Sequence, residues 1–227
     1  MDDDSLLTDD DRSSSSGSED DAAPTSAAES LRLIEAQTAA AARSLRPDPR
    51  LTYWPWGVAW LIGFGLLFLR HGPDEQIRWD IPGWLPLATL YTLMVVASVV
   101  SGFAGARAGR QVSGDSSTQG LMYGLSWFVG FAGVAVIANH FGVLLPEPEK
   151  GLLWAALSVG LVGVLYMAGG GIWKSRDLFI LGCWLNISNF AGVLAGTGWH
   201  SLVISLAGGG GLLVAGLIEW LGTRRRR

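Results

Sequence analysis

The sequence has little cysteine, little lysine and, beyond residue 53, little charge. Cys183 is the only cysteine among 227 residues, which excludes an intrachain disulfide and argues against a cysteine-based metal site. The chain also lacks a nucleophile paired with a base, a phosphate-binding loop and a cluster of metal ligands. We therefore expect no catalytic residues, no cofactor and no metal. The acidic start of the chain does not resemble a secretory signal peptide, so we expect the first hydrophobic stretch to direct insertion.

Six hydrophobic stretches follow residue 53, and each is long enough to cross a membrane. A transmembrane helix needs about 20 mostly apolar residues. The stretches are apolar on all faces, unlike the helices of a soluble core. The sequence predicts an all-α, polytopic membrane bundle of six transmembrane helices over residues 53–221, embedded in the lipid bilayer. The six stretches are Tyr53–Leu69, Trp84–Ala104, Gln119–Val143, Gly151–Ile172, Asp177–Ala195 and Trp199–Leu221.

The basic residues lie mostly on alternate connections between these stretches. One side receives only Arg70, Arg78 and Lys150. By the positive-inside rule, the richer side is cytoplasmic. We therefore expect both termini, including the basic tail over residues 222–227, to be cytoplasmic. The richer side receives Arg32, Arg43, Arg46, Arg50, Arg107, Arg110, Lys174, Arg176 and Arg224–Arg227.

Two segments precede the first stretch. Half of the 20 acidic residues lie before Ser30, and this Ser-rich tail has almost nothing to bury, so we expect disorder over residues 1–25. Residues 26–46 predict a cytoplasmic amphipathic helix, with Ser26 and Glu29 at capping-box spacing. Its narrow stripe favours packing on the bundle or on a second copy over anchoring in the membrane. The stripe consists of Leu31, Ile34, Ala41, Ala42 and Leu45.

The six stretches form three hairpins with related sequences. The first and third stretches share the pattern aromatic-Gly-x-small-Trp-x-x-Gly-Phe, at Trp56–Phe64 and Tyr123–Phe131. In the fifth stretch, Asn189–Gly192 aligns with Gly130–Gly133, which places Asn186 where the others carry Trp. This spacing favours three parallel two-helix repeats. The alternative is chance recurrence in spans rich in Gly and Trp.

Polar residues inside the fifth stretch are the main candidate site residues. Asn186 and Asn189 lie one turn apart on one helix face, with Ser188 beside them. An amide in hydrocarbon must find hydrogen-bond partners, so this face should point inward. Two interpretations stay open, namely interhelical hydrogen bonding and a polar patch that lines a solute path.

A glycine run in the last stretch is a second candidate. It lies near the middle of the membrane, where a broken helix can expose backbone carbonyls to a cavity. The alternative is tight packing beneath a bulky neighbour such as Trp184. The run consists of Gly208, Gly209, Gly210 and Gly211.

Charged and titratable residues near the span ends supply weaker candidates. Glu219 is expected to pair with Lys174 or with the terminal arginines, and Asp177 is expected to cap the fifth helix. His140 and His200 fall at the outer ends of their stretches. There we expect exposed interfacial side chains.

Three runs around the first stretch carry a resemblance to known proteins. They are Ile34-Glu35-Ala36-Gln37, Pro47-Asp48-Pro49-Arg50-Leu51 and Trp56-Gly57-Val58-Ala59-Trp60-Leu61-Ile62-Gly63-Phe64. They resemble uncharacterised actinobacterial six-span integral membrane proteins that are loosely called transporters. The resemblance implies a bacterial cell membrane but transfers no functional residue. The layout is also similar to that of ABC-2-type exporter permeases, but the connection Gly196–Ser201 is too short for their re-entrant helices.

Two functions remain open. The repeated hairpins, the glycine run and the Asn186 and Asn189 face favour a small-solute or ion transporter or a channel-like protein. The alternative is a non-transporting membrane scaffold or regulator that holds a soluble cytoplasmic protein through residues 1–46. A homo-oligomer is compatible with both. Four terminal arginines do not predict nucleic-acid binding.

Overall fold

The computed structural model describes residues 26–44, 48–73, 79–109 and 115–225. The predicted disordered tail over residues 1–25 and the last two residues of the basic tail lie outside this range. The chain forms two compact units, Met1–Ser44 and Leu45–Arg227.

The first unit contains helix α1 (Ala27–Ser44). Its start is capped by Ser26, whose Oγ accepts a hydrogen bond from the backbone N–H of Glu29 at 3.2 Å. This bond is one half of the predicted capping box. Leu31 and Ile34, which belong to the predicted apolar stripe, are exposed, and so is Leu33 on the other face.

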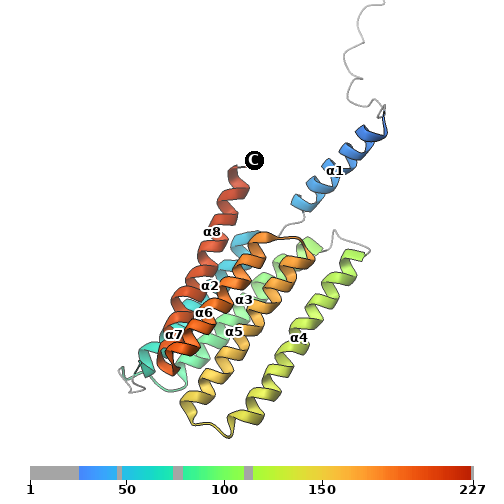
Figure 1. Cartoon of the computed structure of the whole chain (residues 1–227). Helices are drawn as coiled ribbons and strands as arrows, with labels where there is room; N and C mark the ends of the chain where they lie inside the picture. The colour runs from blue at the N-terminus through green and yellow to red at the C-terminus, as the bar shows by residue number, and fades with distance from the viewer. Residues whose placement is uncertain (1–25, 45–47, 74–78, 110–114, 226–227) are drawn as a thin grey trace, which may run out of the picture. The chain divides into compact units, whose positions relative to one another are not determined.

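The second unit is an all-α bundle, which confirms the predicted fold class. Within the described residues there is no strand, and six segments are long and apolar enough to cross a membrane (Figure 1). The chain is a multi-pass membrane protein. Its first five spans are α2 (Pro49–His71), α3 (Leu85–Gly109), α4 (Asp115–Gly142), α5 (Glu147–Ile172) and α6 (Arg176–Ala195).

The sixth span is not a uniform α-helix. It consists of α7 (Thr197–Val203), the π-helix η1 (Ile204–Gly209) and α8 (Gly210–Arg225). A single residue, Gly196, separates α6 from α7, and its φ of 99° lies in the region that favours glycine. This short link makes α6 and the sixth span antiparallel neighbours.

The helix starts follow local capping chemistry. At α2, the Asp48 carboxylate accepts the N–H of Arg50 at 2.9 Å, and Pro49 occupies the first helical position. At α6, Ser175 is the N-cap, and its Oγ accepts the N–H of Leu178 at 3.4 Å. The prediction that Asp177 caps this helix was therefore wrong. Asp177 lies in the first turn instead.

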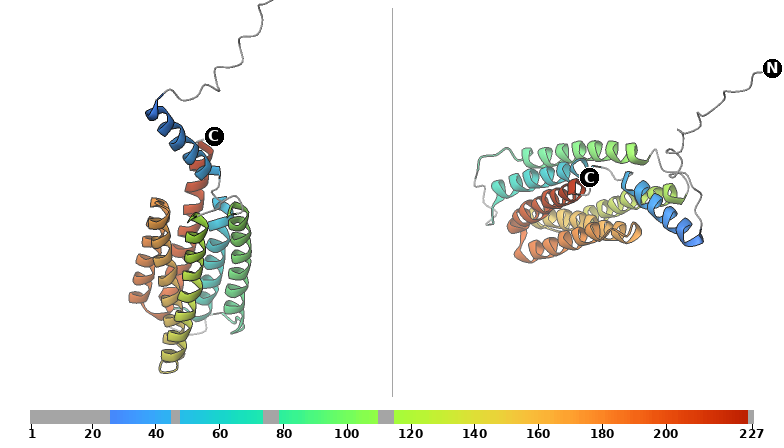
Figure 2. Two further views of the ribbon diagram at one scale, coloured as in Figure 1. Left: turned by 90° about the vertical axis from the view of Figure 1, so that its right-hand side faces the viewer. Right: turned by 90° about the horizontal axis from the view of Figure 1, so that it is seen from above.

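The helices pack in an order that differs from their order along the chain. The principal neighbours of α2 are α3, η1 and α8, while α6 packs on α5, α7 and η1, and α4 packs on α5. Seen from above, α2 lies between α3 and α8 (Figure 2). The helix α4 stands at the edge of the bundle (Figure 1). We call the end at which α2 begins and α8 ends the terminal end.

The first two hairpins share contacts at equivalent positions of the repeated pattern. The first aromatic residue bonds the following span: Trp56 Nε1 donates to Ser101 Oγ at 2.9 Å, and Tyr123 OH donates to the Leu165 carbonyl at 2.8 Å. The second glycine of each pattern packs under a leucine of the following span. These glycine and leucine pairs are Gly63 with Leu90 and Gly130 with Leu161.

The third hairpin differs in the same comparison. Asn186 replaces the tryptophan of the other two hairpins, and it lies against α5, the preceding span. The three-fold repeat therefore stays a prediction.

Glycines bring the backbones of α5 and α6 together. A Cβ added at Gly182 of α6 would lie 2.6 Å from the Gly163 carbonyl oxygen and 2.6 Å from the Met167 nitrogen. Near the terminal end, a Cβ at Gly170 of α5 would lie 2.7 Å from the Phe179 nitrogen. Close backbone approach of this kind drives helix association in lipid.

We predict that Gly182→Ala destabilises the bundle, because the added methyl group meets backbone atoms that cannot move aside. Overpacking of this kind costs about 1–3 kcal/mol. The matched control is Gly102→Ala on α3, where an added Cβ meets nothing within 4 Å, so it should be neutral or stabilising by up to about 1 kcal/mol. Thermal unfolding in mild detergent measures both, and equal unfolding temperatures would contradict the prediction.

Candidate functional site

Five polar side chains are buried in the described part of the chain. They belong to three consecutive elements, α6, α7 and η1. Burying a polar group in an apolar environment is unfavourable unless it is hydrogen-bonded, so their partners decide what this region can do. The residues are Asn186, Ser188, Asn189, His200 and Ser205.

Asn189 joins three helices. Its side chain is 3% exposed, and its Nδ2 donates to the Ala156 carbonyl of α5 at 2.9 Å. Its Oδ1 lies 2.9 Å from Nε2 of His200 on α7. Because an amide oxygen only accepts, His200 donates from Nε2 in this contact. Both ends of the Asn189 amide are therefore used in packing.

His200 is 1% exposed, so the prediction of an exposed interfacial histidine was wrong at this position. His140 is exposed. The imidazole of His200 fits over Gly192 of α6, where an added Cβ would lie 3.0 Å from the ring carbon Cδ2. The one-residue link at Gly196 folds α7 back onto this glycine. The position of His200 near the end of a span predicts exposure at the membrane interface, but gives no sign that α7 packs against α6 there.

Asn186 reaches the backbone of α5. The orientation that satisfies both ends of its amide has the nitrogen donating to the Gly160 carbonyl at 3.2 Å and the oxygen accepting from the Val164 N–H at 3.2 Å. In the opposite orientation, Nδ2 lies 3.7 Å from Sδ of Met167. Gly163 leaves the room for this contact, since a Cβ there would lie within 2.9 Å of three Asn186 side-chain atoms.

The predicted glycine run overlaps η1, and the helix is both widened and tightly packed there. Trp184 of α6 donates from Nε1 to the Ala207 carbonyl at 2.8 Å, and a Cβ at Gly211 would lie 2.6 Å from the same nitrogen. On the other side, Ser205 Oγ donates to the Leu61 carbonyl of α2 at 2.7 Å. The sixth span is thus hydrogen-bonded to α6 and to α2. A π-helix within an α-helix frequently marks a functional position.

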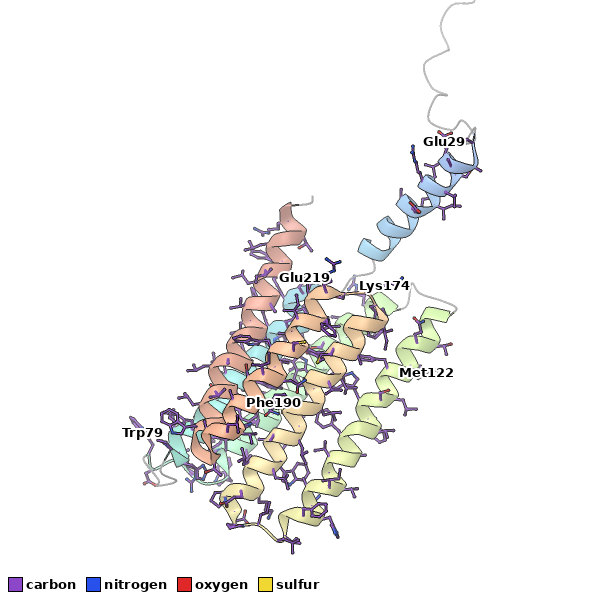
Figure 3. The ribbon with its side chains drawn as sticks, viewed as in Figure 1. Glu29, Trp79, Met122, Lys174, Phe190 and Glu219 are labelled. Carbon is purple, nitrogen blue, oxygen red and sulfur yellow. The ribbon has the colours of Figure 1, made fainter. Side chains whose placement is uncertain are left out.

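Among the described residues no ion pair joins Glu219 to Lys174, and the alternative pairing of Glu219 with the terminal arginines stays a prediction, since Arg226 and Arg227 lie outside the described residues. Ion pairs join Arg50 to Asp48 at 2.9 Å and Lys150 to Glu147 at 3.2 Å. Lys174 lies on the turn between α5 and α6, and Glu219 lies on α8. Figure 3 shows both at the terminal end, and Trp79 at the opposite end.

Two grooves open on the bundle surface. The larger, with a volume of ≈ 590 Å³, is lined mainly by apolar side chains of α2 and α3. The smaller lies at the turn between α5 and α6. In the described part of the chain, no group of three or more His, Cys, Asp or Glu side chains could hold a metal ion.

Comparison of the chain with protein-family models, curated proteins and solved structures finds no match.

We predict that Asn189 and His200 stabilise the bundle through their mutual hydrogen bond. In a double-mutant cycle of Asn189→Ala and His200→Phe, the coupling free energy should be about 0.6 kcal/mol and should not exceed about 1.7 kcal/mol. The control is Ser126→Ala, because Ser126 Oγ donates to the Met122 carbonyl of its own helix and should change stability little. Unfolding in mixed detergent micelles measures the cycle, and additive effects would contradict the bond.

Proposed function

We propose that this multi-pass membrane protein is a non-transporting scaffold or regulator that holds a soluble cytoplasmic protein through its N-terminal region. The observation that carries the proposal is that Leu31 and Ile34, two residues of the apolar stripe of α1, are exposed within their own unit. Leu31 is 61% exposed and Ile34 is 58% exposed. An amphipathic helix whose apolar side chains are not buried within its own unit suits the groove of a partner protein.

The packing of the candidate polar residues supports the same proposal. Asn186 and Asn189 are bonded to backbone atoms of α5 and to His200. These bonds use the amides for helix association, so a solute would have to displace them. Lining a solute path with these asparagines would therefore cost more free energy than using them to hold the helices together, because the existing hydrogen bonds would have to break.

The proposed side of the membrane follows from the charges at the two ends. Of the described basic residues, Arg50, Arg107, Lys174, Arg176 and Arg224 belong to the terminal end, and Arg70 and Lys150 belong to the opposite end. The positive-inside rule then assigns the terminal end, where α2 begins, to the cytoplasm. A bacterial cell membrane is part of this proposal.

The test is purification of the tagged full chain at native expression level, followed by mass spectrometry of stoichiometric partners. We expect the double substitution Leu31→Glu and Ile34→Glu to release the soluble partner, because two charges on the apolar stripe oppose its burial. The matched control is Leu33→Glu on the other face of α1, which is also exposed and should keep the partner.

Retention of the partner by the double variant would overturn the proposed contact. Full biological activity after removal of residues 1–45 would overturn the scaffold proposal as a whole.

A second function, transport of a small solute, is favoured by the surroundings of η1. Trp60 is 3% exposed and packs on Gly208 of η1, and its indole N–H has no hydrogen-bond partner among the described residues. A buried donor beside a widened helix turn is where a solute carrying an acceptor oxygen could bind.

If the protein transports a solute, we expect the flux to fall when the helix directly after η1 is made less flexible. Gly210→Ala and Gly222→Ala both add a methyl group that meets nothing within 4 Å. Reconstituted protein should lose solute flux with the first substitution and keep it with the second. Absence of flux in the unsubstituted protein would contradict transport. Equal flux in both variants would contradict a role for flexibility at η1.

A further inference from the structure

The turn between α5 and α6 carries a groove whose lining combines charge with apolar surface. We call it the turn groove, and it has a volume of ≈ 360 Å³. It lies at the terminal end, between the last turn of α5 and the first turn of α6. Its lining residues are Gly170, Gly171, Lys174, Ser175, Arg176, Phe179 and Ile180.

Both charged side chains of the turn groove are cations. Lys174 and Arg176 are exposed, and neither takes part in the ion pairs of the described residues. The first turn of α6 adds positive potential at this turn and the last turn of α5 adds negative potential, so the charged side chains decide the sign. The neighbouring Asp177 carries the opposite charge but does not line the groove. The lining therefore complements an anion.

The rest of the turn groove is apolar and faces outward from the bundle. Phe179 is 44% exposed and Ile180 is 64% exposed, although both belong to a span long and apolar enough to cross the membrane. Two glycines of α5 form part of the opposite lining. A ligand that fits here needs an anionic part at the turn and an apolar part along α6.

The turn groove lies where two candidate spans end, which is the level at which we expect lipid headgroups. It lies between the candidate spans Glu147–Ile172 and Arg176–Ala195, and Trp173, at the same turn, is 45% exposed. Tryptophan prefers the membrane interface. Phosphate groups of phospholipids occupy this level, whereas acyl chains begin just below it.

We propose that the turn groove is a binding site for an anionic phospholipid. Lys174 and Arg176 hold the headgroup phosphate, and an acyl chain follows Phe179 and Ile180. Basic pockets between transmembrane helices recognise anionic headgroups in this way. The proposal does not rest on the scaffold function.

The backbone at Lys174 makes a clean test available. Lys174 has a φ of 52°, a left-handed conformation that is unfavourable for a residue other than glycine. The substitution Lys174→Gly therefore removes the charge while suiting the backbone. Lys174→Asn provides a second variant, because asparagine also tolerates this conformation.

The experiment is native mass spectrometry of the full chain in mild detergent, titrated with phosphatidylglycerol or with phosphatidylcholine of the same acyl chains. We expect saturable binding of phosphatidylglycerol and weaker binding of phosphatidylcholine. Each interfacial cation strengthens attraction to anionic lipid about fivefold. The double variant Lys174→Gly with Arg176→Gln should therefore bind phosphatidylglycerol roughly 30-fold more weakly.

Two control variants separate this site from general charge effects. Lys150→Gln removes the only other lysine, which lies at the opposite end, and should leave the affinity unchanged. Replacement of Arg224–Arg227 by glutamine should leave the saturable binding in place.

The proposal is overturned if the double variant binds phosphatidylglycerol like the unsubstituted chain, or if the two lipids bind equally. It is also overturned if inorganic phosphate alone displaces phosphatidylglycerol at equal concentration, because the groove would then be a phosphate site and not a lipid site.

Discussion

The close approach of the α5 and α6 backbones is the constraint on which the rest of the bundle depends. Apolar helix faces gain little by leaving lipid for each other, so association relies on packing distance and on hydrogen bonds. Gly163 and Gly182 supply the short distance. The same short distance lets the amide of Asn186 span one turn of the α5 backbone. Larger residues at the two glycines would separate the helices and leave the amide without partners in hydrocarbon. Glycine and asparagine thus act together here, because the glycines bring the two helices close enough for the Asn186 amide to reach the α5 backbone.

The α5–α6 pair also positions the sixth span. Because one residue links α6 to α7, the chain reverses at once and places His200 on Asn189. The span then continues into η1, whose residues bond to helices on both sides through Trp184 and Ser205. The first hairpin is held by these contacts, since η1 and α8 are principal neighbours of α2. The contacts that position the helices therefore run from α5 and α6 through the sixth span to α2, and α2 in turn packs on α3.

The sequence predicts the features that depend on which residues can lie in lipid. It leaves open the features that depend on how neighbouring helices align along their axes. Apolar length predicts six spans, but α2 begins at Pro49 rather than Tyr53, because a helix extends beyond the hydrocarbon to its capping residue Asp48. An inward Asn186 follows from the cost of an unpaired amide, whereas its partners on α5 depend on how two helices align. The π-helix at Ile204–Gly209 and the buried His200 depend on contacts across helices. No local signal encodes those contacts, although glycines at Gly192 and Gly196 accompany them.

The same contacts decide where this molecule can change shape. Separating α5 from α6 would strand the amides of Asn186 and Asn189 in hydrocarbon, and a buried amide without a partner costs about 1–3 kcal/mol. Separating α4 from α5 would free the Tyr123 hydroxyl, and Tyr123 lies toward the terminal end of its helix, within reach of the interface. Its ring contacts with Trp173 are also near that end. Movement of α4, with the α5–α6 pair as one body, therefore leaves the buried amides paired, whereas movement of η1 would break the hydrogen bonds of Trp184 and Ser205. This division holds for a scaffold and for a transporter alike, because it follows from the energetics of the buried amides.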